Sequence, residues 1–157
     1  MDRLCYAASF CPLPLTQSFE VILSEFAKYD APRLVRALLP YASCTPPGSA
    51  AEGAVGESPQ VRLTALRVVC NSIRFFASAQ LLSQLSTLIP AVLTSINSPL
   101  ADLRKAVVFI LVEVYLSVGD SVFPHIHSLT PPQRKLMTIY VEKRMNERKH
   151  VVAAALT

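Results

Sequence analysis

The residues with the clearest metal-binding chemistry in this chain are His125 and His127, which follow Pro124. Imidazole nitrogens bind zinc, but a zinc site needs three or four protein ligands and partners that orient them. No cysteine or carboxylate motif accompanies the pair as a third ligand. We therefore expect loop histidines that are hydrogen-bonded to the backbone, and no metal site.

The cysteines show neither a CxxC pair nor a plausible zinc spacing; they are Cys5, Cys11, Cys44 and Cys70. The N-terminal residues lack the apolar region and cleavage site of a secretory signal. We expect reduced thiols in a cytosolic or nuclear protein, with Cys70 packed as a small hydrophobic residue. The longest uncharged stretch, residues 75–101, holds ten Ser, Thr, Gln or Asn residues and Pro90, so no membrane insertion is expected.

Nothing in the chain has the form of a catalytic motif. It contains no glycine-rich phosphate loop, no GxSxG or HExxH sequence and no catalytic pairing of cysteine with histidine. The eleven carboxylates are scattered, and none forms an evident pair on one face. We therefore expect a protein that acts by binding, without enzymatic activity and without a cofactor.

The net charge of +4 lies entirely in residues 131–157, because bases and acids balance in residues 1–130. A capping helix is predicted there, with Leu136, Ile139, Tyr140 and Val141 facing the core. Two interpretations of its basic residues stay open, either the polar outer surface that a helical stack needs or a surface for acidic partners such as a Glu-rich coiled coil. The candidate partner-binding residues, all predicted to point outward except Lys135, are Arg134, Lys135, Lys143, Arg144, Arg148 and Lys149.

Helical periodicity dominates the chain, and no segment alternates long enough to form a strand. Apolar residues recur at spacings of three and four in four further segments, after a first helix at 16–29. These segments are residues 32–43, 60–77, 81–96 and 102–118. Gly119 ends the last of them, so residues 81–119 are predicted to form a helical hairpin.

The hairpins repeat. Leu38-Leu39-Pro40 corresponds to Leu88-Ile89-Pro90, and Val61-Arg62 corresponds to Leu103-Arg104. The 42 residues from Val61 to Leu103 lie within the period of HEAT-type repeats, about 40–47 residues. The prediction is an all-α solenoid of stacked hairpins.

The domain is expected to span residues 16–150. Residues 45–59 hold three of the four glycines and three prolines, which predicts a flexible insertion. Residues 1–15 are expected to be partly disordered, and residues 151–157 to form a tail.

Several short motifs distinguish this chain from other helical-repeat sequences more specifically than the helical periodicity does. In order and spacing they resemble the last helical-repeat domain of the CLASP proteins, the cytoplasmic linker-associated proteins of microtubule ends. The resemblance covers residues 60–145 well and residues 15–44 more loosely. The motifs are DLRKAVVF (102–109), VGD (118–120), PH (124–125), LT (129–130) and KLMTIYVEKR (135–144).

The resemblance implies a right-handed α-solenoid of TOG type, an armadillo-like superhelix from the C-terminal end of a longer protein. It implies a role in stabilising microtubule plus ends, in the cytoplasm, on the cytoskeleton and the spindle. The implied partners are plus-end tracking proteins, kinetochore or other coiled-coil adaptors, and microtubules, bound directly or through a partner.

Arg104 and Lys105 belong to the matched motif and are further candidates for partner binding. The favoured alternative is a structural pairing of these bases with Asp102 or with a carboxylate of a neighbouring repeat. Phe109 is expected in the core, with lining of an exposed groove as the alternative.

TOG domains contact tubulin through a tryptophan and basic residues on the turns between paired helices. This chain has no tryptophan, and its turns at 45–59 and 97–101 have no base, so docking of adaptor proteins is favoured over tubulin contact. A generic HEAT-repeat scaffold or transport adaptor without a microtubule role is the main alternative. Nucleic-acid binding by the tail is disfavoured, because Tyr140 alone accompanies its bases.

Overall fold

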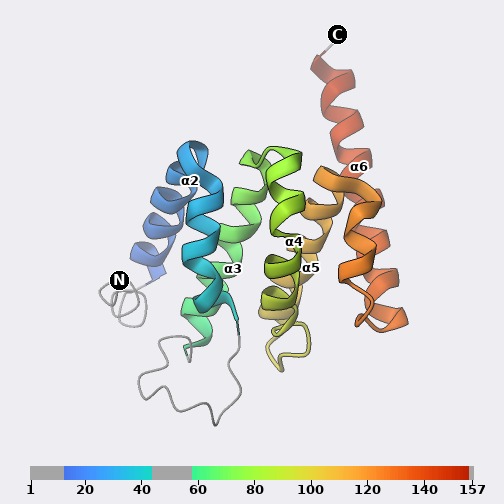
Figure 1. The fold of residues 1–157 in the computed structure, drawn as a ribbon. Helices are drawn as coiled ribbons and strands as arrows, with labels where there is room; N and C mark the ends of the chain where they lie inside the picture. Colours follow the sequence, from blue (N-terminus) through green and yellow to red (C-terminus); the bar gives the residue numbers. More distant parts are fainter. Residues whose placement is uncertain (1–12, 44–57, 156–157) are drawn as a thin grey trace.

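The computed structural model describes the backbone of residues 13–43 and 58–155 and the side chains of residues 18–43 and 58–147. All regular structure in these residues is helical, which confirms the all-α class. The helices lie side by side in one row, with α2 and α6 at opposite ends (Figure 1). The elements are α2 Leu13–Ala42, α3 Pro59–Ser72, η1 Ile73–Phe75, α4 Ser78–Leu93, α5 Ala101–Val118, η2 Gly119–His125 and α6 Pro131–Ala155.

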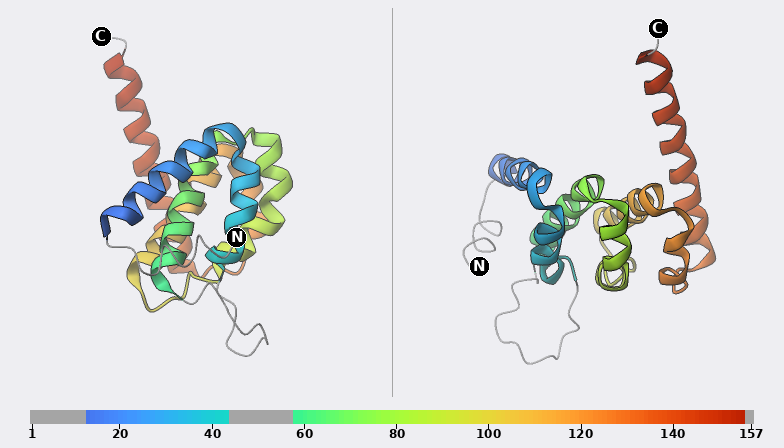
Figure 2. Two further views of the ribbon diagram at one scale, coloured as in Figure 1. Left: turned by 90° about the vertical axis from the view of Figure 1, so that its left-hand side faces the viewer. Right: turned by 45° about the horizontal axis from the view of Figure 1, so that its top comes forward.

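The row has two layers. In one layer α3 contacts α5 and α5 contacts α6, while in the other α2 contacts α4 and α4 contacts η2. The hairpins α2–α3 and α4–α5 join the layers, and the views of Figure 2 show the same order. Each hairpin thus covers the next, as predicted for stacked HEAT-type repeats. The right-handed twist of the solenoid stays a prediction.

Helix α2 is interrupted at Asp30, whose φ of −151° and ψ of 72° are not helical. The Asp30 carboxylate accepts a hydrogen bond from the backbone N–H of Arg33 at 3.1 Å, as an N-cap residue does. Pro32 therefore lies in the first turn of the second segment, where its missing N–H costs nothing. The separate helices predicted at 16–29 and 32–43 are confirmed as two segments of one bent element.

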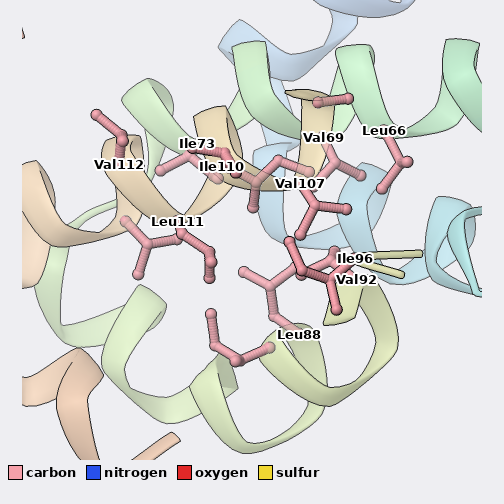
Figure 3. Packing of buried hydrophobic residues seen from close by; sticks show 14 of the residues in the cluster. Leu66, Val69, Ile73, Leu88, Val92, Ile96, Val107, Ile110, Leu111 and Val112 are labelled. Carbon is pink, nitrogen blue, oxygen red and sulfur yellow. The ribbon is translucent and has the colours of Figure 1, made fainter. Parts of the chain in front are cut away.

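The core is built around α5, which contacts α3, α4, α6 and both 3₁₀ helices. Its Val107, Ile110 and Leu111 are buried, and in Figure 3 they meet side chains of α3 and α4. Gly119 ends the helix with a φ of +63°, and its N–H donates to the carbonyl of Tyr115. This matches the predicted helix end.

The face of α6 that packs on the core differs from the prediction. Met137 and Val141 are buried, and Tyr140 packs partly buried against the core. Leu136 and Ile139 are instead 43% and 52% exposed. The prediction was wrong for these two residues, because contacts with the preceding turn set the rotation of the helix.

Those contacts come from Arg134 in the first turn of α6. Its Nε donates to the carbonyl of Leu129 at 3.0 Å, and its Nη2 donates to the carbonyl of His127 at 3.2 Å. They hold Met137 and Val141, four residues apart, toward α5. The last turns of α6 project beyond the row of helices (Figures 1 and 2).

Ala101–His125, which joins α5 to η2, is long and apolar enough to cross a membrane, with a mean hydropathy of 1.9 in its most apolar window. Half of that window is buried inside the fold. A core helix meets the same criterion, and the buried contacts of α5 show that it is one.

The predicted insertion at 45–59 lies outside the described residues except for Ser58 and Pro59, where α3 begins. Most of residues 1–15 lie outside them as well. The side chains of the predicted tail, 151–157, are also outside the described part.

Candidate partner-binding site

A groove of about 280 Å³ lies where α3, α5 and α6 meet. We call it the α3–α5–α6 groove. It combines aromatic rings with several charged groups. Its lining residues are Cys70, Asn71 and Arg74 from α3 and η1, Phe109, Val112 and Glu113 from α5, and Tyr140, Lys143, Arg144 and Glu147 from α6.

Glu113 is the central charge of the groove. Its side chain is only 4% exposed, and two arginines from different elements reach it. Arg74 donates from Nη2 to Oε1 at 3.0 Å and from Nε to Oε2 at 3.3 Å. Arg144 donates from both Nε and Nη2 to Oε1 at 3.1 Å. The three residues form an ion triad that ties η1, α5 and α6 together.

The triad shifts the pKa values of Glu113 and Arg144. Burial by itself would raise the pKa of Glu113, but the hydrogen bonds and charges of Arg74 and Arg144 outweigh it and hold that pKa below its usual value. The hydrogen bonds from Arg144 to Glu147 and to Glu113 raise the pKa of the Arg144 guanidinium. Glu113 and Arg144 are therefore both charged at neutral pH.

An aromatic pair forms the apolar part of the groove. The rings of Phe109 and Tyr140 meet edge to face, with centroids 5.3 Å apart. Lys105, one turn before Phe109, places its Nζ 5.6 Å from the centroid of the Phe109 ring. This is a cation–π distance. Phe109 therefore lines an exposed groove, which was the alternative to the expected core position.

Among the cations that line the groove, Lys143 is the one whose charge is least neutralised by carboxylates of the described residues. It is exposed, and within the described part of the chain it makes no ion pair. Arg74 and Arg144 are engaged with Glu113, and Arg144 also donates to Glu147 at 3.2 Å. A negative group that entered the groove would thus meet Lys143 without having to break an internal pair.

The structure separates the candidate basic residues into two groups. Arg134 and Arg144 were both predicted to point outward, and both also make internal contacts. Lys105 and Lys143 border the groove, and Lys135 is exposed on α6. Arg148 and Lys149 lie in the backbone of α6, but their side chains are outside the described residues.

Arg104 is structural, through partners other than those expected. Its Nη1 donates to the carbonyls of Ser98 and Pro99 at 2.6 and 2.8 Å, rather than to the Asp102 carboxylate. Both carbonyls lie in the turn between α4 and α5, and the guanidinium of Arg104, in the first turn of α5, reaches both. The turn, which has no charged residue of its own, is therefore covered by a positive group.

Of the two histidines, His127 has the backbone hydrogen bond that was predicted. Nδ1 of His127 lies 2.9 Å from the carbonyl oxygen of Pro124, which is a backbone hydrogen bond. Among the described residues, no group of three or more His, Cys, Asp or Glu side chains is placed to hold a metal ion.

The residues that the sequence analysis missed are Arg74 and Glu113. Glu113 is the only carboxylate on the apolar helix 102–118 apart from Asp102 in its first turn. A charged residue in the middle of a buried helix requires a partner, and this signal was available in the sequence. The identity of that partner was not, because Arg74 and Arg144 lie 39 and 31 residues away.

The thiol of Cys70 also lines the groove, and it is free as predicted. Burial, together with the nearby charge of Glu113, raises its pKa from 9.0 to about 11.

The raised pKa of Cys70 should slow its alkylation. Thiolate is the reactive form, and a pKa that is two units higher lowers the thiolate fraction at neutral pH about 100-fold. In a variant with Cys5, Cys11 and Cys44 replaced by serine, iodoacetamide should alkylate folded Cys70 about 100-fold more slowly than the urea-unfolded chain. Equal rates in the two states would contradict this assignment.

No family model matches the sequence. The chain is 26% identical over 132 residues to a CLIP-associated protein of Arabidopsis thaliana, a match that covers 84% of this chain and 8% of that protein. It is 29% identical over 83 residues to CLIP-associating protein 1-B of Xenopus laevis, covering 53% of this chain and 6% of that protein. CLIP-associating protein 1 of Xenopus tropicalis is 28% identical over the same length. The chain thus spans less than a tenth of the length of these relatives, and the resemblance to CLASP proteins is confirmed.

Proposed function

We propose that this CLASP-like chain is a binding module of microtubule plus ends, where it docks partner proteins and carries out no chemistry of its own. The observation that carries the proposal is the similarity to CLIP-associated proteins over 84% of the chain. The expected location is the cytoplasmic microtubule cytoskeleton, including the spindle.

The mechanism is recognition by a preformed surface. Because the groove lies between three packed helices, its backbone needs little ordering when a partner binds, which lowers the conformational part of the entropy cost of association. Phe109 and Tyr140 provide apolar contact, and Lys105 and Lys143 provide charge. Exposed lysines raise the association rate for acidic partners more than they raise final affinity.

Docking through a partner is favoured over direct contact with tubulin. The turn between α4 and α5 uses its exposed polar groups internally, since Asn97 accepts a hydrogen bond from Gln133 at 3.1 Å and Arg104 holds the carbonyls of Ser98 and Pro99. The chain has no tryptophan to present beside them. Alanine substitutions in residues 97–102 should therefore leave microtubule association unchanged.

Co-sedimentation with microtubules tests this proposal. We expect the chain to pellet when a CLIP-type plus-end tracking protein is added, and to remain in the supernatant without it. Lys143→Glu should reduce pelleting with the partner. Arg144→Glu is unsuitable for this purpose, because it would place a carboxylate beside buried Glu113.

Three other results of these experiments would change the proposed docking mode or the proposed function. Pelleting of the chain alone would indicate direct contact with the microtubule lattice. Loss of pelleting in the 97–102 alanine variant would place the docking surface on the turn. No pelleting in either mixture would contradict the proposal and favour a HEAT-repeat scaffold or transport adaptor without a microtubule role.

A further inference from the structure

We infer that the α3–α5–α6 groove binds an acidic protein segment, which pairs a carboxylate with Lys143 and inserts one large apolar side chain against Phe109 and Tyr140. This inference rests on the proposed docking function and names the class of partner and the residues that select it.

The charge of the groove favours an acidic peptide segment over a neutral or basic one. Three cations and two carboxylates line it, and Lys105 adds a fourth cation beside Phe109. Glu113 is already neutralised by two arginines, and Glu147 is held by Arg144. The cations left to act on a ligand are Lys105 and Lys143, so a basic or neutral segment gains nothing from them, whereas an acidic one does.

The aromatic pair selects for an apolar anchor. Phe109 and Tyr140 are only partly buried, although ring surface of this size is normally covered in a helical core. A cavity of about 280 Å³ is at the small end for a ligand site. It suits a single anchoring side chain, the usual centre of a protein interface, and is too small for a whole helix.

One bound peptide segment can contact both the lysines and the aromatic pair. Lys143 follows Tyr140 by one turn on α6, and Lys105 precedes Phe109 by one turn on α5. A residue bound against the two rings therefore has a lysine one turn away on each of the two helices. An acidic segment that carries a leucine or an aromatic residue between its carboxylates fits this arrangement.

A fluorescent peptide of repeated Glu-Glu-Leu units is a suitable probe, with anisotropy measured against the full chain at low salt. Two matched peptides separate the two contributions, one with Leu replaced by Ser and one with Glu replaced by Gln. We expect each replacement to weaken binding about tenfold.

Charge reversal on α6 locates the site. Lys143→Glu should raise the dissociation constant of the Glu-Glu-Leu peptide about tenfold. Lys135→Glu makes the same change in charge on the same helix but outside the groove, and should change the dissociation constant less than about twofold. Thermal melts followed by circular dichroism should show that both variants fold.

Equal effects of the two lysine substitutions, or equal binding of the Leu→Ser peptide, would overturn the inference, because the attraction would then depend on net charge alone. If the Glu-Glu-Leu peptide fails to bind the unsubstituted chain while partner-dependent pelleting of that chain occurs, the groove inference fails and the docking function stands. If the peptide binds as expected but no microtubule association occurs, the proposed function fails and the groove assignment stands.

Discussion

Replacing Arg74 and Arg144 together by methionine should lower the free energy of unfolding by about 3–5 kcal/mol, the cost of leaving a buried charge without its partners. The carboxylate of Glu113 is 4% exposed, so it cannot regain its solvation when the arginines are removed. The arginines themselves are 47% and 41% exposed and would lose little. The loss should therefore come from the carboxylate.

The triple variant that also carries Glu113→Leu tests this cause. Replacing a buried ion cluster by apolar residues of similar volume is often neutral or stabilising, so the triple variant should recover most of the loss. Lys143→Met is the matched control, because it removes a neighbouring cation that has no ion pair in the described structure, and it should change stability by less than about 0.5 kcal/mol. Urea denaturation measures all three. A triple variant as unstable as the double variant would show that packing of the arginine side chains, and not the carboxylate, explains the loss.

The same triad should make stability depend on acid pH. The pKa of Glu113 is lower in the folded chain than in the unfolded chain, so the unfolded state binds the proton more readily. The contribution is present in full above the unfolded pKa of about 4.3 and is lost as the pH falls through the lower folded value. Glu113→Gln should flatten the loss of stability in that window relative to the parent chain. An unchanged pH profile would exclude Glu113 as its source.

Leu111→Ala should cost about 2–5 kcal/mol, as expected for truncation of a fully buried leucine. Leu111 is 1% exposed and lies on α5, which contacts elements of both layers (Figure 3). A cavity at this position therefore weakens the packing between successive hairpins as well as the hydrophobic burial of one side chain.

Leu136→Ala is the control for this substitution. It removes the same atoms from a side chain that is 43% exposed, and should change stability by about 0.5 kcal/mol or less. Both variants are compared by urea denaturation at one pH. A large loss in Leu136→Ala would mean that the face of α6 containing Leu136 is the buried one, as the sequence pattern had predicted.

Most of the fold could be predicted from the sequence. The predicted helices 60–77, 81–96 and 102–118 correspond to α3 with η1, α4 with the turn after it, and α5. The positions and ends of these helices depend on interactions within a few residues of chain, so the local sequence is enough to predict them. The signals used were helix periodicity, the glycine at position 119 and the proline at position 32. The 42-residue repeat also predicted that the hairpins stack, because each hairpin in a repeat protein contacts only its neighbours along the chain.

The prediction of the site was less complete, and the errors have one origin. Lys143 is exposed, as its predicted outward orientation requires. Arg144, the next residue, faces Glu113 because a helix turns by about 100° per residue. For α6, apolar residues at 136, 137, 139, 140 and 141 allowed two inner faces. The pattern could not choose between them.

The sequence by itself determined where the helices lie, that they stack as repeated hairpins, and that the positive charge gathers at one end. Only the tertiary structure decided which cations remain available to a partner. It brought Arg74 and Arg144 from separate elements to Glu113 and rotated α6 through the contacts of Arg134. Local patterns reflect interactions over one or two helical turns, whereas a buried carboxylate takes its partners from whatever elements the packing places beside it.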